Sequence, residues 1–181
     1  MKKIFFAILS IGFLAGCTTP TKVPFTSYTV FTEELRRDLE GAGIPVEKVQ
    51  FYNDKQLIIK REGINPNDIN VTQEGKISIQ NGKSVQTITV RAFTPGVALG
   101  SANGSINVSW DDTQQDEKGI RFNITGNQYY LHTTEDSKVD YKDYKYDVQS
   151  GMGARLYVNK DLLNQVNSQK ETLKGRRVGE N

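Results

Sequence analysis

The sequence predicts a mainly β domain, a sandwich or a barrel-like fold of about eight to ten strands, with a short N-terminal helix and a second helix near the C-terminus. Two observations support this fold class. After Val46, apolar and polar residues alternate with the period of two that is typical of strands with one buried face. Turn signals rich in glycine and asparagine separate these runs at intervals of roughly 8–12 residues.

The first element is expected to be a helix that begins after Thr32. The Thr32 hydroxyl can cap the helix, and two glutamates in the first turn favour the positive end of the helix dipole. Leu35 and Leu39 fall on one face, so the helix is expected to pack on the sheet through them. Gly41 and Gly43 end it after about two turns.

Two hairpins are predicted next. The Asn-Asp dipeptide at residues 53–54 separates two alternating apolar runs and predicts a tight turn between adjacent strands. The clearer hairpin joins strand 77–80 to strand 85–93 through the Asn-Gly dipeptide at 81–82. Asn-Gly supplies the two positive φ angles that a type I′ turn requires.

The remaining strands follow a segment, 94–100, that is expected to break or bend the sheet because it combines a proline with two glycines. Later alternating runs predict five strands, at residues 106–110, 120–124, 129–133, 141–148 and 154–158. Trp110 shares a face with Ile106 and Val108, which predicts that its ring anchors the core. Residues 160–174 are expected to form the final helix.

The N-terminal segment has the features of an export signal. Two lysines precede an almost purely apolar run over residues 4–16, which is shorter than the roughly 20 residues needed to span a bilayer. The run ends in Leu14-Ala15-Gly16-Cys17, and Cys17 is the only cysteine of the chain. This segment resembles the signal peptide of a bacterial lipoprotein, with these four residues as its lipobox. The resemblance implies that residues 1–16 are removed and that Cys17 carries acyl chains such as palmitate.

The expected organisation is therefore a signal peptide at 1–16, a lipidated tether at 17–28 and one mainly β domain at 29–181 with a polar C-terminal tail. Two prolines favour an extended tether, which would hold the domain roughly 25 Å from the membrane. Thr18 is not the aspartate that retains lipoproteins in the inner membrane of enteric bacteria, and no acidic cluster for surface export follows Cys17. The resemblance thus implies an outer-membrane anchor and a domain that faces the periplasm, in a host with two membranes.

The charge balance argues against a nucleic-acid partner. Removal of the signal peptide takes two lysines from the 23 basic residues, which leaves 21 basic against 21 acidic residues. A nucleic-acid footprint needs a concentrated basic face, and only the tail from 170 to 177 is locally basic. Because the one cysteine is expected to be lipidated, we expect the domain to fold without a disulfide.

The sequence offers no complete catalytic or metal-binding motif. The Gly-x-Ser-x-Gly elbow of hydrolases is absent, and His132 is the only histidine. A lone histidine on a strand is typical of a polar surface or edge position. Zinc sites need three or four His or Cys ligands, and the carboxylate-rich loops lack the ordered calcium motif. We therefore expect a protein that is not an enzyme and that has no catalytic residues, no metal and no cofactor.

Tyrosines crowd the last third of the chain. A tyrosine ring with its polar tip suits recognition surfaces and carbohydrate stacking, although tyrosine is also common in half-buried strands. The candidate binding surface consists of Tyr129, Tyr130, Tyr141, Tyr144 and Tyr146.

These features predict a lipid-anchored envelope protein that acts as a non-enzymatic anchor or accessory component and docks a protein partner. The alternative is a lipoprotein that binds a glycan or a small ligand through the tyrosine-rich face. A deep pocket lined by Tyr129, Tyr144 or Tyr146 would favour the ligand. A flat apolar patch or an open sheet edge would favour the protein partner.

Overall fold

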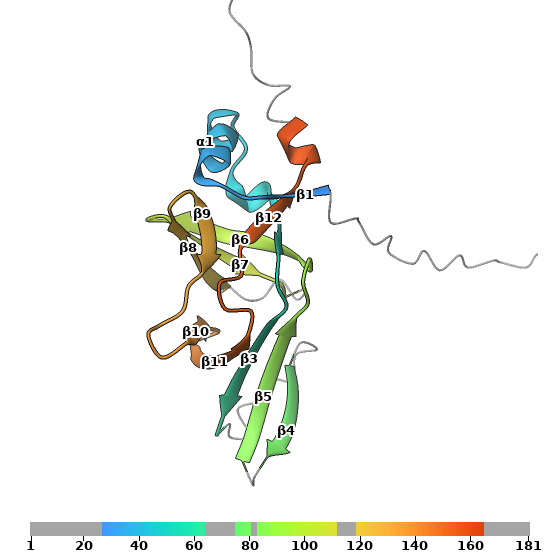
Figure 1. The fold of residues 1–181 in the computed structure, drawn as a ribbon, viewed down its shortest axis with the longest axis vertical. Coiled ribbons are helices and arrows are strands. Elements are labelled where there is room, and N and C mark those ends of the chain that lie inside the picture. Colours follow the sequence, from blue (N-terminus) through green and yellow to red (C-terminus); the bar gives the residue numbers. More distant parts are fainter. Residues whose placement is uncertain (1–26, 64–74, 81–82, 112–118, 165–181) are drawn as a thin grey trace, which may run out of the picture.

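The computed structural model describes residues 27–63, 75–80, 83–111 and 119–164 (Figure 1). In these residues twelve strands form two sheets, one of seven strands and one of five. All of the strand pairings are antiparallel. The mainly β fold class is therefore confirmed. The strands outnumber the predicted eight to ten, because some predicted runs contain a turn and one predicted break is itself a strand.

In both sheets the order of the strands differs from their order in the sequence. The larger sheet has the spatial order β1-β12-β2-β6-β7-β8-β9, and the smaller has the order β10-β11-β3-β5-β4. The strands of the larger sheet are β1 (Tyr28–Val30), β2 (Gln50–Asn53), β6 (Pro95–Ala102), β7 (Ser105–Ser109), β8 (Ile120–Thr125), β9 (Gln128–Leu131) and β12 (Leu156–Asn159). Those of the smaller sheet are β3 (Leu57–Glu62), β4 (Gly75–Gln80), β5 (Lys83–Val90), β10 (Lys138–Tyr141) and β11 (Tyr144–Ser150). In Figure 1, β3, β5 and β4 extend as a ribbon at the end of the molecule opposite the helix α1 (Glu33–Gly41).

The seven-stranded sheet curls until its last strand meets the chain just before β12. The backbone N–H of Leu131, at the end of β9, donates to the carbonyl of Ala154 at 2.7 Å. Next to it, Tyr130 forms an antiparallel bridge with Arg155. The larger sheet is therefore barrel-like, which is one of the two arrangements that the strand spacing predicts.

The core contains residues from both sheets and from the helix α1. Phe31, Phe51 and Phe122 are fully buried, and the first two rings meet edge to face with centroids 4.8 Å apart. Trp110 packs against Phe122 with a centroid distance of 5.9 Å, and its indole N–H donates to the Thr94 carbonyl at 3.1 Å. Trp110 is only partly buried, so it borders the core rather than occupying its centre.

The helix α1 forms where the sequence predicts it. The Thr32 hydroxyl accepts a hydrogen bond from the backbone N–H of Leu35 at 3.2 Å and so caps the helix. Leu35 and Leu39 are buried in the core, as expected. The nine residues make two and a half turns, and a short 3-10 helix, η2 (Val46–Lys48), then leads into β2.

The prediction of a hairpin at residues 53–54 is wrong, because β2 and β3 belong to different sheets. The buried Asn53 amide donates to the Lys55 carbonyl at 2.6 Å. The Asp54 carboxylate accepts hydrogen bonds from the backbone N–H of Arg155 at 2.8 Å and from its Nε at 3.0 Å. These bonds fix a bend that takes the chain from one sheet to the other.

Residues 94–100 bend the sheet rather than break it. Most of this segment belongs to β6, which pairs with both β2 and β7. A shift in the pairing register between Ala98 and Gly100 produces the bend. Proline is tolerated because Pro95 is the first residue of the strand.

The hairpin of β4 and β5 is confirmed. Gln80 lies opposite Lys83, and the Asn-Gly turn at 81–82 is outside the described residues. The predicted final helix is described only at residues 161–164, which are helical.

The single strand predicted at 141–148 is instead part of a hairpin. Tyr141 pairs with Tyr144 across a two-residue turn between β10 and β11. Lys142 and Asp143 occupy this turn with φ angles of 48° and 67°. The turn contains no glycine or asparagine, so the usual sequence signal for such a turn is missing.

Candidate functional site

Two adjoining pockets lie where the two sheets meet, and we call them together the inter-sheet cleft. The polar pocket has a volume of about 450 Å³ and the apolar pocket about 380 Å³. The polar pocket is lined by Asn107, Gly119, Arg121, His132, Asp140, Tyr141, Lys142 and Asp143. The apolar pocket is lined by Ile88, Thr89, Val90, Arg91, Thr94, Trp110, Ile120 and Tyr141. The two pockets therefore share Tyr141.

One wall of the polar pocket is a row of three side chains across neighbouring strands. Asn107 on β7 is the register partner of Arg121 on β8. The backbone N–H of His132, just after β9, donates to the Arg121 carbonyl at 2.9 Å and continues the row. These residues alternate along their strands with the buried Ile106 and Phe122, so the row lies on the face of the sheet opposite the core.

The facing wall is the turn of the β10–β11 hairpin. The Lys142 ammonium lies 2.5 Å from the Asp111 carboxylate, which is 1% exposed. Because Asp111 follows β7, this ion pair fixes the turn against the larger sheet. The Asp140 carboxylate is paired with Lys145 at 2.8 Å. Arg121 is exposed, and its guanidinium has no hydrogen-bond or ion-pair partner in the part of the chain that the structure describes.

His132 is half-buried at the end of the row. The Asn123 amide nitrogen lies 3.1 Å from His132 Nδ1. With the amide nitrogen as the donor, Nδ1 is the acceptor and the ring proton is on Nε2. Asn123 Oδ1 is buried and has no hydrogen-bond partner among the described residues.

The apolar pocket is formed between β5 and the ends of β7 and β8. Ile88 and Val90 contribute from β5, and Trp110 and Ile120 contribute from the larger sheet. Trp110 can approach β6 because residue 96 is a glycine. A Cβ atom at Gly96 would lie 2.7 Å from the indole nitrogen.

The structure does not bring the five predicted tyrosines into one exposed surface. Tyr129, Tyr141 and Tyr146 are buried, because each occupies an inward-facing position on its strand. Tyr130 is half-buried on β9, and Tyr144 is 45% exposed on β11, in the other sheet. Of the five, Tyr141 lines the inter-sheet cleft.

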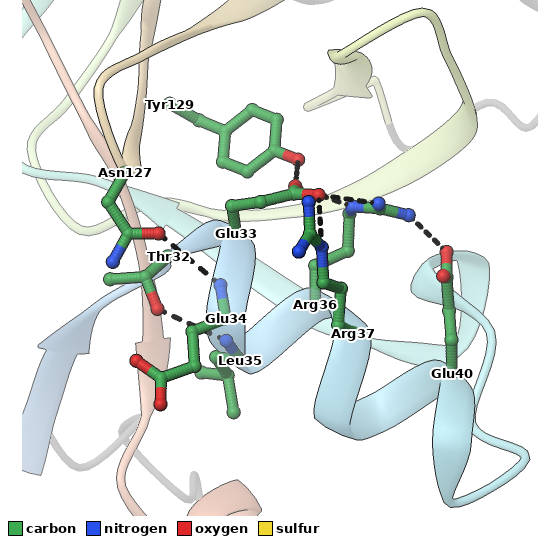
Figure 2. Close-up of polar contacts among 9 residues, drawn as sticks. All are labelled: Thr32, Glu33, Glu34, Leu35, Arg36, Arg37, Glu40, Asn127 and Tyr129. Atoms are coloured by element: carbon green, nitrogen blue, oxygen red, sulfur yellow. Dashed lines mark hydrogen bonds and ion pairs between the residues drawn. The ribbon is translucent and has the colours of Figure 1, made fainter.

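A second polar cluster joins α1 to the β8–β9 turn (Figure 2). The Glu33 carboxylate accepts hydrogen bonds from Arg36 at 2.7 Å, Arg37 at 3.1 Å and the Tyr129 hydroxyl at 2.5 Å. The Arg36 hydrogen bond is the main cause that lowers the pKa of Glu33 to about 2, and the hydrogen bonds of Tyr129 and Arg37 add to it. Burial, together with the hydrogen bond to Glu33, raises the pKa of Tyr129. Arg36 also pairs with Glu40, so each charge of this cluster has a partner, and the Tyr129 hydroxyl ties the helix to β9.

The sequence singled out Tyr141 as a binding residue, Trp110 as a core residue and His132 as a polar surface or edge residue, but it did not predict that they line one cleft. Asn107, Arg121 and Lys142 belong to no motif, and only the order of strands in the sheets brings them together. Cys17, the predicted lipidation site, lies outside the described residues. Within the described ranges, no group of three or more His, Cys, Asp or Glu residues could hold a metal ion. The helices in these ranges are too short or too polar to span a bilayer.

No protein-family model, curated protein or solved structure matches this chain. The interpretation of the cleft therefore depends on the residues that line it.

Proposed function

We propose that this chain is a lipid-anchored envelope protein that works by binding, as a non-enzymatic accessory component that docks a protein partner in the inter-sheet cleft. The proposal is carried by the cleft, in which an apolar and a polar pocket adjoin at Tyr141. Protein interfaces bury a few anchor side chains in desolvated pockets, so the apolar pocket suits an anchor of the partner and the polar groups beside it suit the rim of the interface. The lipobox-like Leu14-Ala15-Gly16-Cys17 supports the anchor.

The lining of the polar pocket supports binding over nucleophilic catalysis. No serine, threonine or cysteine is among the described residues that line it, so His132 has no such nucleophile beside it there. The ring of His132 is instead engaged with the Asn123 amide.

Two further features favour a protein partner. β4 is an outer strand of the smaller sheet and has a strand neighbour on one side only in the described part of the chain. Such an edge can pair with another chain. On the larger sheet, the side chains of Val97 and Leu99 on β6 are 44% and 37% exposed.

A lipoprotein that binds a small ligand is the second candidate, and one observation favours it. The volumes of both pockets lie within the range of roughly 300–1,000 Å³ that is typical of small-molecule sites. The tyrosine-rich face would contribute only Tyr141 to such a site.

Site-specific photocrosslinking in intact cells tests the proposal. Thr89 and Asp143 are exposed residues of the apolar and the polar pocket. A photoreactive residue at either position is expected to give a covalent adduct with the same protein, identified by mass spectrometry. The matched control is Lys48, an exposed residue of η2 that lines neither pocket.

The possible results separate the two candidates. A single protein adduct from both cleft positions and none from Lys48 supports docking. An adduct of low mass at the cleft positions would instead support the second candidate, a lipoprotein that binds a small ligand. The absence of any adduct at the cleft, or an equal yield at Lys48, contradicts the proposal.

A further inference from the structure

We infer that the polar pocket is an anion site, which receives a carboxylate or phosphate group of the bound molecule with Arg121 as its counter-ion. This inference rests on the proposed function, because it takes the inter-sheet cleft as the binding site. It adds the chemistry of the group that is recognised there.

The row of Asn107, Arg121 and His132 presents three hydrogen-bond donors along one wall of the pocket. Arg121 is the central member, with Asn107 as its partner on β7 and the backbone of His132 on its other side. Directly opposed side chains on neighbouring strands have Cβ atoms roughly 5 Å apart, so the three can reach one small group. A guanidinium offers two parallel N–H donors that match a carboxylate or a phosphate. With the Asn123 amide as the donor to Nδ1, the His132 ring adds an Nε2 proton.

The other charges of the pocket have partners. Lys142 is paired with the buried carboxylate of Asp111, and Asp140 is paired with Lys145. Asp143 also has an interaction of its own. Among the described residues of the lining, Arg121 is thus the charged residue for which the structure shows no hydrogen-bond or ion-pair partner. A bound anion would complete this set of ion pairs, whereas a cation would meet a like charge.

Each pocket contains a reporter that occurs once in the chain. His132 is the only histidine and lines the polar pocket, and Trp110 is the only tryptophan and lines the apolar pocket. The imidazole resonance and the indole fluorescence therefore report on the two pockets separately.

The experiment uses the full lipidated chain in micelles of an uncharged detergent, purified without a histidine tag and labelled at histidine for NMR. Sodium acetate, inorganic phosphate and sodium chloride are titrated at constant pH and ionic strength. We expect acetate or phosphate to shift the His132 ring resonance saturably, while chloride does not. The oxyanion that binds more tightly identifies the group, a carboxylate or a phosphate. Trp110 fluorescence is expected to stay constant.

Substitutions at Arg121 assign the effect. Arg121→Gln is expected to weaken oxyanion binding by about tenfold or more, since it removes a charge-assisted hydrogen bond. Arg121→Lys keeps the charge but loses the paired donors, so an intermediate affinity is expected. Lys48→Gln removes the same charge from an exposed site outside the cleft and should bind as the unmodified chain does. Thermal unfolding shows that each variant is folded.

Three results would overturn the inference. The first is the absence of a saturable His132 shift with acetate and phosphate, and the second is a shift that chloride reproduces. The third is a folded Arg121→Gln variant that binds the oxyanions as tightly as the unmodified chain. The titration needs no partner protein. A saturable His132 shift without a crosslinked protein would therefore support the anion site and contradict protein docking. A crosslinked protein without a His132 shift would support docking and contradict the anion site.

Discussion

Trp110 lies at a junction of the core, the strand β6 and the apolar pocket. Its ring packs on Phe122, and its indole N–H donates to the Thr94 carbonyl at 3.1 Å. A Cβ atom at Gly96 would lie 2.7 Å from the indole nitrogen and 2.9 Å from the Ser109 carbonyl oxygen. The large residue and the small one therefore fit each other, and this fit positions one wall of the cleft.

Gly96→Ala should destabilise the domain by about 1–3 kcal/mol, because backbone as well as side-chain atoms would have to move to admit the methyl group. Urea unfolding followed by circular dichroism measures this free energy. Gly41→Ala is the matched control, since no atom lies within 4 Å of a Cβ atom there. An equal effect of the two substitutions would contradict the explanation.

Trp110→Ala should lower the free energy of unfolding by roughly 2 kcal/mol or more, through the loss of packing on Phe122. Trp110→Phe keeps much of the packing and removes the hydrogen bond to Thr94, so a loss of about 1 kcal/mol is expected. Thermal melts by circular dichroism are the measurement. Unchanged melts together with lost crosslinking in cells would make Trp110 a contact residue only.

The helix α1 is held at its first turn by a carboxylate. Glu33 accepts hydrogen bonds from Arg36 and Arg37 on the helix itself and from Tyr129 on β9 (Figure 2). The hydrogen bond from Arg36 is the main cause that lowers the pKa of Glu33 to about 2, so the carboxylate is ionised above that pH. Protonation of Glu33 at lower pH should weaken the contacts that attach α1 to the larger sheet.

Glu33→Gln should cost the most stability near neutral pH. Because the pKa of Glu33 is lower in the folded chain, its contribution is fully present above about 4.5 and is lost as the pH falls towards 2. The shift corresponds to a contribution of roughly 3 kcal/mol at most. Urea unfolding at several pH values should show the difference between the two proteins shrinking over this range. Glu34→Gln, at an exposed neighbouring position, should have a much smaller effect at neutral pH.

Local signals account for the elements that the sequence predicted well. α1 could be predicted because its capping residue and its apolar face lie within ten residues of one another. The β4–β5 hairpin could be predicted because its two strands follow each other directly in the sequence. The bend at 53–54 was not, because its bonds reach Arg155, about a hundred residues along the chain. The same reason applies to the cleft. The walls of the cleft come from strands that are distant in the sequence, and no local pattern predicts their order in the sheets. In the sequence alone, Arg121 has the pattern of any outward-facing strand residue.

At the scale of the whole molecule, the described domain has two distinct ends. β1 begins at Tyr28, the last residue of the predicted tether, and lies near α1 (Figure 1). The ribbon of β3, β5 and β4 extends in the opposite direction. With the proposed anchor at Cys17, the β1 end would face the membrane and the ribbon would reach away from it.

Cys17→Ser should abolish acylation, because the proposed modification requires the thiol. Cells labelled with a fatty-acid analogue provide the measurement, and the variant is expected to carry no label and to leave the membrane fraction. Cys17→Ala serves as a second variant without a hydroxyl. Label retained in either variant would disprove the anchor.

The order of the larger sheet also constrains when this protein can fold. β12 pairs with β1 on one side and β2 on the other, so the last described strand lies between the first two. In a chain that is made from its N-terminus, the larger sheet therefore cannot be completed until residues 156–159 are present. Loss of those few residues would remove every strand partner of β1 and one of the two partners of β2. Chaperone protection during this interval would matter more here than for a fold assembled from adjacent hairpins.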